Sequence, residues 1–491
     1  MKLLLKIIKE IFTSPYLWLG LILIAAFQVR TYRLERPLAD WHAWRQADTA
    51  AVSRNFVKEG FTVLEPKYDD MSPVSEESLP NPGRFRYVEF PFYNLIVSAL
   101  WLGTGISEPV ARIVSIVFSL GAIVFLFLLT REFSNNLFAL VASAIFAFLP
   151  FNIYYSTVIM PEPMLLFTML GSLYFFKLWI DGNTLVKDLI LGFLAILFFA
   201  VALLLKPTSA FLLLPIFYLA YTKYGLNFIK SAKVGIFLII SPLPFLAWRV
   251  ISLAHPEGIP RWLWLLNTSG IRFKGAFFYW IVQDRLGRLI LTLPGFGLFI
   301  LGLVSKPFKK ENLFFYMFLA SMLAYVVVFA QGNVTHDYYQ VPLLPILSIF
   351  VAKGVYFLVT FGKNLIQKGA GVLLALFLLI LMFGLGWREV RDLFNINDQK
   401  IVEAGEVANL ILPKDAKVIA PYGGNTVFLY YTQRPGWAIG LLPIPEMREK
   451  LGATHYVTVN FNSEAADLAA AYKTLYSNNR FVIIDLTQKK L

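Results

Sequence analysis

Long apolar segments constrain this chain more than any other feature of its sequence. A membrane-crossing helix needs about 20 mainly apolar residues, and about eleven segments approach that length. Hydrophobic residues make up 57% of the chain and charged residues 15%, whereas soluble proteins average roughly 45–50% and about 25%. A purely water-soluble fold is therefore excluded. The segments cover residues 12–29, 110–130, 137–155, 164–180, 189–205, 209–221, 234–251, 289–304, 313–330, 341–360 and 371–387.

The positions of the basic residues predict how the chain is oriented. Lys2, Lys6 and Lys9 precede the first segment, which lacks a cleavage site and resembles an uncleaved anchor. Cytoplasmic loops are enriched in lysine and arginine, and alternate loops here are basic, which accounts for the net charge of +13 without a nucleic-acid partner. The intervening loops, including residues 30–108, are then expected outside. Residues 90–105 are apolar but short, and are interpreted as an interfacial helix within that loop.

The composition becomes mixed after Trp387. Apolar residues at helical spacing predict helices over 401–411 and 464–476, and short apolar runs predict strands over 417–422, 455–460 and 480–486. We therefore predict a polytopic α-helical membrane protein. Its transmembrane domain would span residues 1–387, followed by a small extracytoplasmic α/β domain at residues 388–491.

Four acidic residues are candidates for catalysis, because charge near a membrane is costly and tends to be functional. If residues 40–48 are helical, Asp40 and Asp48 share one face, and Arg45 lies three residues before Asp48. One carboxylate could then act as a general base while arginine holds the other, although both could simply pair or cap. Glu89 and Glu162 each lie beside a proline at a predicted outer boundary, where stabilisation by a helix dipole is an equally good explanation.

Basic and hydroxyl side chains on the outer side depart from the usual charge distribution. As a set they suit a lipid-linked phosphate held by charge-assisted hydrogen bonds, although any one of them could be an interfacial anchor. The candidate phosphate ligands are Lys206, Arg272, Arg285, Arg288, His336 and Tyr339.

No metal or soluble cofactor is expected. The chain has no cysteine, its four histidines are scattered, and no acidic run resembles a calcium loop. A glycine-rich nucleotide motif is absent from the sequence, so nucleotide sugars and ATP are not expected as substrates.

Six short motifs occur in the order found in the GT-C membrane glycosyltransferases. They are RQADTAAVSRNF, YVEFPFYNLIVSALWLGTG, VIMPEPMLLF, LLLKPTSAF, FFYWIVQDRLGR and THDYYQVPLLPILSI. The chain resembles the group that contains the protein O-mannosyltransferases and the lipid A aminoarabinose transferases, and within it the bacterial PMT-2 or Rgt-like branch. The segment AKVIAPYGGNTVFLYYTQRPG also resembles the outer domain of the aminoarabinose branch.

The chain departs from this family at two acidic positions. The family's Asp-Glu pair falls at Arg45 and Gln46, and its boundary aspartate is Glu162 here. By resemblance, the base would be Asp40 or Asp48. Asp40 is preferred, because a carboxylate near Arg45 and Arg54, as Asp48 is, would be a weaker base and a better structural clamp.

The resemblance implies inverting transfer of a sugar from a polyprenyl-phosphate carrier to a hydroxyl on the outer face of the plasma membrane. The acceptor would be a glycan, lipid or protein, and the carrier would supply its own leaving group. Lys206, Arg272, Arg285 and His336 would offset charge on the departing phosphate. A lipid-carrier flippase or an envelope assembly subunit is the alternative, but the sequence shows no repeated halves of the kind transporters have.

Overall fold

The computed structural model describes residues 14–182 and 184–490. Two compact units emerge, each assembled from segments far apart in the sequence. The helical unit comprises Met1–Leu34, Ser115–Trp248 and Trp262–Asp392, and the mixed unit comprises Glu35–Val114, Arg249–Arg261 and Leu393–Leu491. Lys2, Lys6, Lys9 and the first two residues of segment 12–29 lie outside the described residues.

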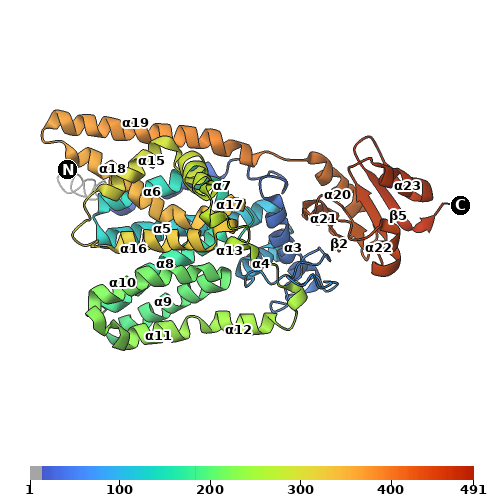
Figure 1. Cartoon of the computed structure of the whole chain (residues 1–491), viewed down its shortest axis with the longest axis horizontal. Coiled ribbons are helices and arrows are strands. Elements are labelled where there is room, and N and C mark those ends of the chain that lie inside the picture. The colour runs from blue at the N-terminus through green and yellow to red at the C-terminus, as the bar shows by residue number, and fades with distance from the viewer. Residues whose placement is uncertain (1–13, 183, 491) are drawn as a thin grey trace, which may run out of the picture. The chain divides into compact units, whose positions relative to one another are not determined.

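Many of the helices in Figure 1 lie wholly or mainly in the helical unit. Its α-helices are α2 (Pro15–Arg30), α5 (Glu108–Phe133), α6 (Asn136–Phe148), α7 (Pro150–Tyr155), α8 (Glu162–Asp181), α9 (Leu185–Leu205), α10 (Leu213–Tyr224), α11 (Ala232–Ile240), α12 (Leu243–Ser252), α13 (Trp264–Asn267), α14 (Gly275–Phe278), α15 (Thr292–Val304), α16 (Phe314–Val328), α17 (Ala330–Thr335), α18 (Leu344–Phe361) and α19 (Leu365–Val390). Five short 3₁₀ helices lie between or after them among the described residues: η1 (Pro207–Leu212), η2 (Gly225–Lys230), η4 (Ile271–Phe273), η6 (Asp337–Leu343) and η7 (Arg391–Phe394). A longer π-helix, η5 (Tyr279–Ile290), precedes α15.

Small residues let two of these helices approach until their backbones touch. A Cβ atom on Gly302 of α15 would lie 1.9 Å from the carbonyl oxygen of Phe350 in α18, and one on Gly354 would lie 2.0 Å from that of Leu298. Apolar helices gain little from hydrophobic burial inside a lipid bilayer, so close packing of this kind holds them together.

Six helical segments of the described chain are long and apolar enough to cross a membrane. They are Glu108–Phe133, Glu162–Asp181, Leu185–Leu205, Ala232–Ser252, Asp337–Phe361 and Leu365–Ile411. A seventh arises if Gly275–Ile290 and Thr292–Val304, which meet at 112°, form one span. The predicted segments 12–29, 137–155 and 313–330 correspond to shorter apolar helices. A helical membrane architecture is thus present, and the number of eleven crossings stays a prediction.

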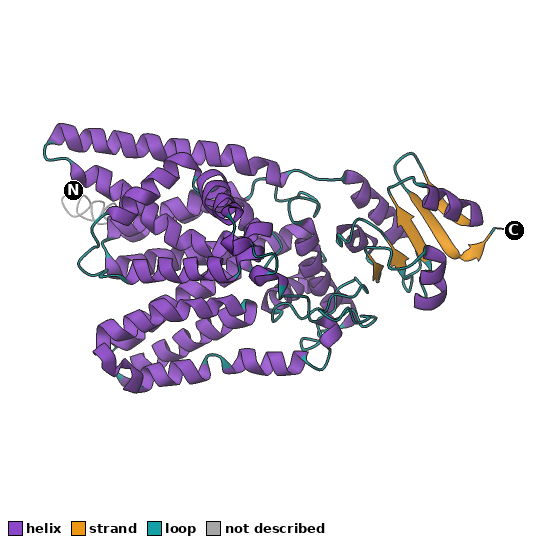
Figure 2. Cartoon of the chain, in the orientation of Figure 1, coloured by secondary structure: helices purple, strands orange, loops and turns teal. Residues whose placement is uncertain are grey.

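The mixed unit contains the small sheet predicted for the C-terminal region (Figure 2). Its helices are α3 (Ala43–Glu59), α4 (Phe92–Thr104), η3 (Pro256–Gly258), α20 (Gln399–Ile411), α21 (Val427–Thr432), α22 (Ile444–Leu451) and α23 (Ser463–Ala471). Its strands are β1 (Val418–Ile419), β2 (Gly436–Trp437), β3 (His455–Thr458), β4 (Tyr472–Ser477) and β5 (Val482–Lys489). The order is β2-β1-β3-β5-β4, with β1 parallel to β2 and β3, and β5 antiparallel to both its neighbours.

One helix predicted in this region is a strand in its second half. The helix predicted over 464–476 ends at Ala471, and the chain continues as β4, an edge strand paired with β5. Tyr472, Thr474 and Tyr476 are residue types that favour strands, and pairing with β5 prevails over the helical spacing of the preceding alanines. Strand β2 was not predicted, because a two-residue strand leaves no periodic pattern.

The first loop folds together with the C-terminal segment. Met71 belongs to the apolar core of the sheet, beside Trp437 and Tyr456, and its amide donates to the carbonyl of Gly436 at 2.7 Å. The amide of Trp41 donates to the carbonyl of Leu393 at 3.1 Å. The compact unit is therefore not a linear C-terminal domain, but combines residues from both sides of the helical unit in the sequence.

Candidate functional site

Asp40 lies in a turn of the mixed unit and is fully buried. Arg36 donates through Nε to Oδ2 at 2.6 Å, and the Gln46 amide donates to Oδ1 at 2.8 Å. Helix α3 begins at Ala43, so Asp40 precedes it and does not share a helical face with Asp48. His42 adopts a left-handed conformation with φ of 52°, which reverses the chain direction before the helix. Asp40 was preferred as the base because Asp48 lies near Arg45 and Arg54 in the sequence, yet Asp40 is itself ion-paired with Arg36, four residues upstream.

Asp48 lies on α3 and ties three segments of the mixed unit together. Arg86 donates to its Oδ2 at 2.6 Å, and the Thr426 hydroxyl of the C-terminal segment donates to its Oδ1 at 2.7 Å. The sequence suggested Arg45 as its partner, but Arg45 binds Glu89 instead. Both Glu89 oxygens accept from Nη2 of Arg45, at 2.7 and 2.8 Å.

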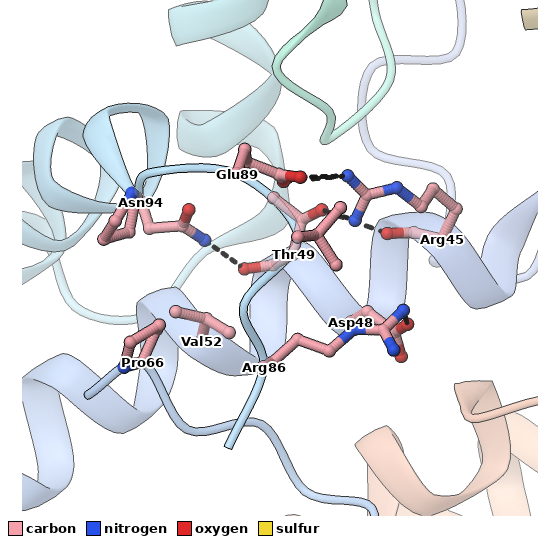
Figure 3. A pocket seen from close by; sticks show the side chains of 10 residues that line it. Arg45, Asp48, Thr49, Val52, Pro66, Arg86, Glu89 and Asn94 are labelled. Atoms are coloured by element: carbon pink, nitrogen blue, oxygen red, sulfur yellow. Dashed lines mark hydrogen bonds and ion pairs between the residues drawn. The ribbon is translucent and has the colours of Figure 1, made fainter. Parts of the chain in front are cut away.

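These pairs surround a small pocket, shown in Figure 3. Arg45 and Glu89 face each other on one side, Asp48 and Arg86 on another, and the Asn94 amide points to the Thr49 carbonyl, to which it donates at 2.7 Å. The empty volume is about 260 Å³. Arg45, Glu89 and Asp48 each take part in at least two side-chain hydrogen bonds, so this part of the pocket wall is preorganised.

Further buried acids of the mixed unit escaped the sequence analysis. Asp69 pairs with Arg54, whose guanidinium also lies 4.5 Å from the ring centre of Tyr430. Burial raises the pKa of Asp70 from 3.8 to about 6, although hydrogen bonds from Ser72 lower it. The only signal in the sequence is the presence of three acids between Glu65 and Asp70, which does not reveal burial.

Lys206 and Glu162 form an ion pair in the helical unit. Lys206 is the non-helical residue that follows α9, and Glu162 opens α8. The Lys206 Nζ lies 2.6 Å from Glu162 Oε1, and Glu162 is fully buried with its second oxygen, Oε2, lacking a hydrogen-bond partner among the described residues. The ammonium also lies 5.3 and 5.2 Å from the ring centres of Tyr338 and Tyr339. Cation–π contacts of this kind favour a cation at this position.

Aromatic residues extend the cluster around Lys206. His336 stacks on Tyr338, with ring centres 5.4 Å apart, and approaches Trp264 edge-on at 5.7 Å. Asp337, which the sequence analysis did not select, accepts from the Tyr155 hydroxyl at 2.7 Å and is buried. Lys206, Glu162, His336 and Tyr339, predicted separately from the sequence, thus belong to one cluster.

The three candidate arginines of the helical unit already have partners. Arg272 donates to the carbonyls of Val327 and Val328, at the end of α16, at 2.6 and 2.8 Å. Arg285 and Arg288 share Asp284, at 2.7 and 2.8 Å. Arg285 also donates to the Val334 carbonyl at 3.0 Å, and Arg288 pairs with Glu389. All three arginines thus bind carbonyl or carboxylate oxygens of the protein itself. Their part in phosphate binding stays a prediction.

Among the described residues, no group of three or more histidines, aspartates and glutamates is arranged to hold a metal ion. That the protein needs no metal and no soluble cofactor stays a prediction.

Residues 91–248 match the family model described as dolichyl-phosphate-mannose-protein mannosyltransferase. That segment includes α4, Glu162 and Lys206, and is less than half of the chain. The search of curated proteins finds no match.

Several solved structures share the fold over most of this chain. ArnT from Cupriavidus metallidurans bound to undecaprenyl phosphate matches with a TM-score of 0.64 and 14% identity, over 95% of this chain and 97% of that one. AglB from Archaeoglobus fulgidus, in complex with an inhibitory peptide and a dolichol-phosphate, matches with a TM-score of 0.56 and 10% identity, over 95% and 74%. The arabinofuranosyltransferase AftD from Mycobacteria gives 0.58 and 13%, over 90% and 35%.

The family match over residues 91–248, together with the fold shared with ArnT, AglB and AftD, confirms the resemblance inferred from the sequence motifs. At identities of 10–14% the property shared with them is the fold. The family match and the apolar helices indicate an integral membrane protein. Both comparisons support glycosyltransferase as the class of enzyme.

Proposed function

We propose that this protein transfers a sugar from a polyprenyl-phosphate carrier to an acceptor hydroxyl, with inversion, at the outer face of the plasma membrane. The observation that carries the proposal is the fold shared with ArnT bound to undecaprenyl phosphate, over 95% of this chain and 97% of that one. The Lys206 cluster supplies, within that fold, a cation with a chemistry suited to phosphate. The acceptor is proposed to be a glycan, lipid or protein, and no soluble cofactor is needed because the carrier phosphate is the leaving group.

Lys206 is the proposed primary ligand of the donor phosphate. Its ammonium is a compact point charge on a flexible stem, which can exchange one oxygen ligand for another. In the structure that ligand is Glu162 Oε1, at 2.6 Å, and the side chain keeps 15% of its surface exposed. As the phosphate leaves the sugar it gains negative charge, which a positioned cation stabilises more in the transition state than in the ground state. Arg272, Arg285, Arg288, His336 and Tyr339 are proposed to support the phosphate.

Asp40 is the proposed base. Asp40 and Asp48 both pair with an arginine, so that pairing does not separate them. The partners of Asp40, Arg36 and Gln46, come from within six residues of it and orient its carboxylate locally. Asp48, in contrast, joins α3 to Arg86 and to Thr426 of the C-terminal segment. That arrangement suits a structural tie, and we propose this role for Asp48, with Glu89 holding Arg45 in the pocket wall. An oriented carboxylate that accepts the acceptor proton contributes about 10²–10⁴-fold to the rate.

Mass spectrometry of the lipid that copurifies with the protein, followed by an in vitro transfer assay, tests the function. We expect a bound polyprenyl phosphate and release of that phosphate coupled to glycosylation of the acceptor. A bound carrier with no transfer to any glycan, lipid or protein acceptor supplied would favour the flippase or assembly reading. Absence of any carrier from the protein, together with no stimulation by added carrier, would contradict the proposal.

A further inference from the structure

A second polar hollow lies at the other end of α8 from Glu162. Helix α8 spans 20 residues, a length of about 30 Å at 1.5 Å per residue, which is close to the thickness of the hydrocarbon core. The hollow at its C-terminal end has an empty volume of about 570 Å³. The end of α5, the end of α10 and the turn before α16 also contribute to its lining. Because α8 is a candidate membrane span, this end of it lies at the depth of lipid headgroups.

Three lysines line the hollow: Lys177 from α8, Lys223 from α10 and Lys310 from the turn. Lys177 and Lys223 both pair with Asp181, the latter at 3.4 Å. Lys310 makes no ion pair with any residue that the structure describes. Tyr218, Thr222 and Asn312, which carry neutral hydrogen-bonding groups, also line the hollow. Lysines that outnumber carboxylates, with neutral hydrogen-bonding groups beside them, are suited to a phosphate group.

The turn that carries Lys310 is fixed in place by buried contacts. Glu311, which also lines the hollow, pairs through Oε1 with Lys353 at 2.9 Å and accepts through Oε2 from the amide of Phe308 at 3.0 Å. The amide of Leu313 donates to the Tyr218 hydroxyl at 3.0 Å. Glu311 and Lys353 are both nearly fully buried, so this carboxylate is neutralised by its own partner. The remaining charges at the hollow are three lysines against Asp181.

We propose that this hollow binds the phosphate headgroup of an anionic phospholipid from the leaflet that adjoins the C-terminal end of α8. Basic pockets between membrane helices hold such headgroups, and each lysine near an anionic surface adds about 1 kcal/mol, which corresponds to roughly a fivefold change in affinity. The acyl chains lie along the apolar surface of the neighbouring helices. The site is separate from the Lys206 cluster and does not depend on the transferase proposal.

Native mass spectrometry of the detergent-purified full chain tests this site, with phosphatidylglycerol and phosphatidylcholine as probes. We expect phosphatidylglycerol to bind more tightly. The triple variant K177Q/K223Q/K310Q should lose about 100-fold in its affinity, as three fivefold factors predict. The variant K177R/K223R/K310R keeps the charges and should restore binding, which separates loss of charge from loss of fold.

The matched control is K187Q/K230Q/K363Q, which removes three lysines that do not line the hollow. It should bind phosphatidylglycerol like the unmodified protein. An equal loss in the two glutamine variants would reduce the effect to general surface charge and overturn the site. Inorganic phosphate at millimolar concentration should compete weakly. If it displaces phosphatidylglycerol completely, and also binds on its own with the same lysine dependence, the ligand is free phosphate and the lipid assignment is overturned.

Discussion

The helical unit and the mixed unit both bury ion pairs, but lysine pairs occur in the former beside arginine ones. In the helical unit, Lys206 pairs with Glu162 and Lys353 with Glu311, while Arg285 and Arg288 share Asp284. In the mixed unit, four arginines hold the buried carboxylates Asp40, Glu89, Asp69 and Asp48. Arginine presents a rigid fork that can bind several oxygens at once, whereas lysine is a mobile point charge. The lysine pairs therefore suit exchangeable charge, whereas the arginine pairs suit fixed charge that orients their carboxylates, Asp40 included.

The largest effect is expected at Asp40. This carboxylate is held by an arginine, like the others of the mixed unit, but it is also the proposed base. Asp40→Asn keeps the side-chain shape but removes the proposed base, so turnover should fall by at least about 10²-fold. The measurement is transfer of labelled sugar from a polyprenyl-phosphate donor, with copurified carrier lipid measured in the same samples. Asp48→Asn is the matched control and should retain most of its turnover per folded molecule. Normal transfer by Asp40→Asn together with inactive, well-folded Asp48→Asn would exchange the two assignments.

The variant Lys206→Ala tests whether the Lys206 ammonium exchanges Glu162 for the donor phosphate. Loss of one interaction with a charged group costs about 1.5–3 kcal/mol, or roughly 10- to 150-fold in donor use. The effect should appear in kcat/KM for the carrier substrate. Lys206→Arg keeps the charge but changes its geometry, and should recover part of the loss. Unaltered donor kinetics in Lys206→Ala would leave this lysine as a simple partner of Glu162.

A smaller change, in stability rather than turnover, is expected for Asp48→Asn. The variant weakens the bond from Arg86 and leaves its guanidinium without a carboxylate in a buried position, at an expected cost of about 1.5–3 kcal/mol. Thermal unfolding in detergent should show a lower melting temperature, and limited proteolysis should cut the first loop sooner. Asp48→Asn with unchanged melting and proteolysis would show that this ion pair does not hold the mixed unit together.

The smallest effect is expected at Asp70 and depends on pH. Burial raises its pKa from 3.8 to about 6 in the folded protein, so the native state binds more protons than the unfolded state between these values. Through this group alone, stability therefore falls as pH rises across that window and levels off above it. Asp70→Asn, which stays neutral, should gain about 2 kcal/mol relative to the parent protein on going from about pH 4 to pH 7. Parallel melting-temperature profiles for both proteins across this range would exclude the effect.

The local hydrophobic pattern of the sequence was sufficient to predict many of the helices and strands. The apolar segments predicted the helices that became α5, α8, α9, α18 and α19, because a long apolar run in a helix satisfies its backbone hydrogen bonds internally wherever it lies. The strands predicted at 417–422, 455–460 and 480–486 overlap β1, β3 and β5, of which β1 and β3 are shorter than predicted. The helix over 464–476 was wrong beyond Ala471, since its second half is decided by pairing with β5.

Candidate site residues were predicted as a set, but their pairing was not. Glu162 and Lys206 were each selected because they lie at the ends of apolar runs, a local property. Arg45 was expected to hold Asp48 because it lies one helical turn away, yet it binds Glu89 instead. Arg86 and Thr426, the actual partners of Asp48, lie 38 and 378 residues away in the sequence. No periodicity connects residues at such separations.

By itself, then, the sequence determined that this chain is a helical membrane protein with a small α/β segment, and which charged residues lie at helix ends. Only the tertiary structure decided that the first loop and the C-terminal segment form one compact unit, and which arginine holds which carboxylate. The physical reason is range. Hydrophobic periodicity and helix capping act between residues a few positions apart, whereas a buried ion pair depends on the path of the whole chain that brings its two partners together.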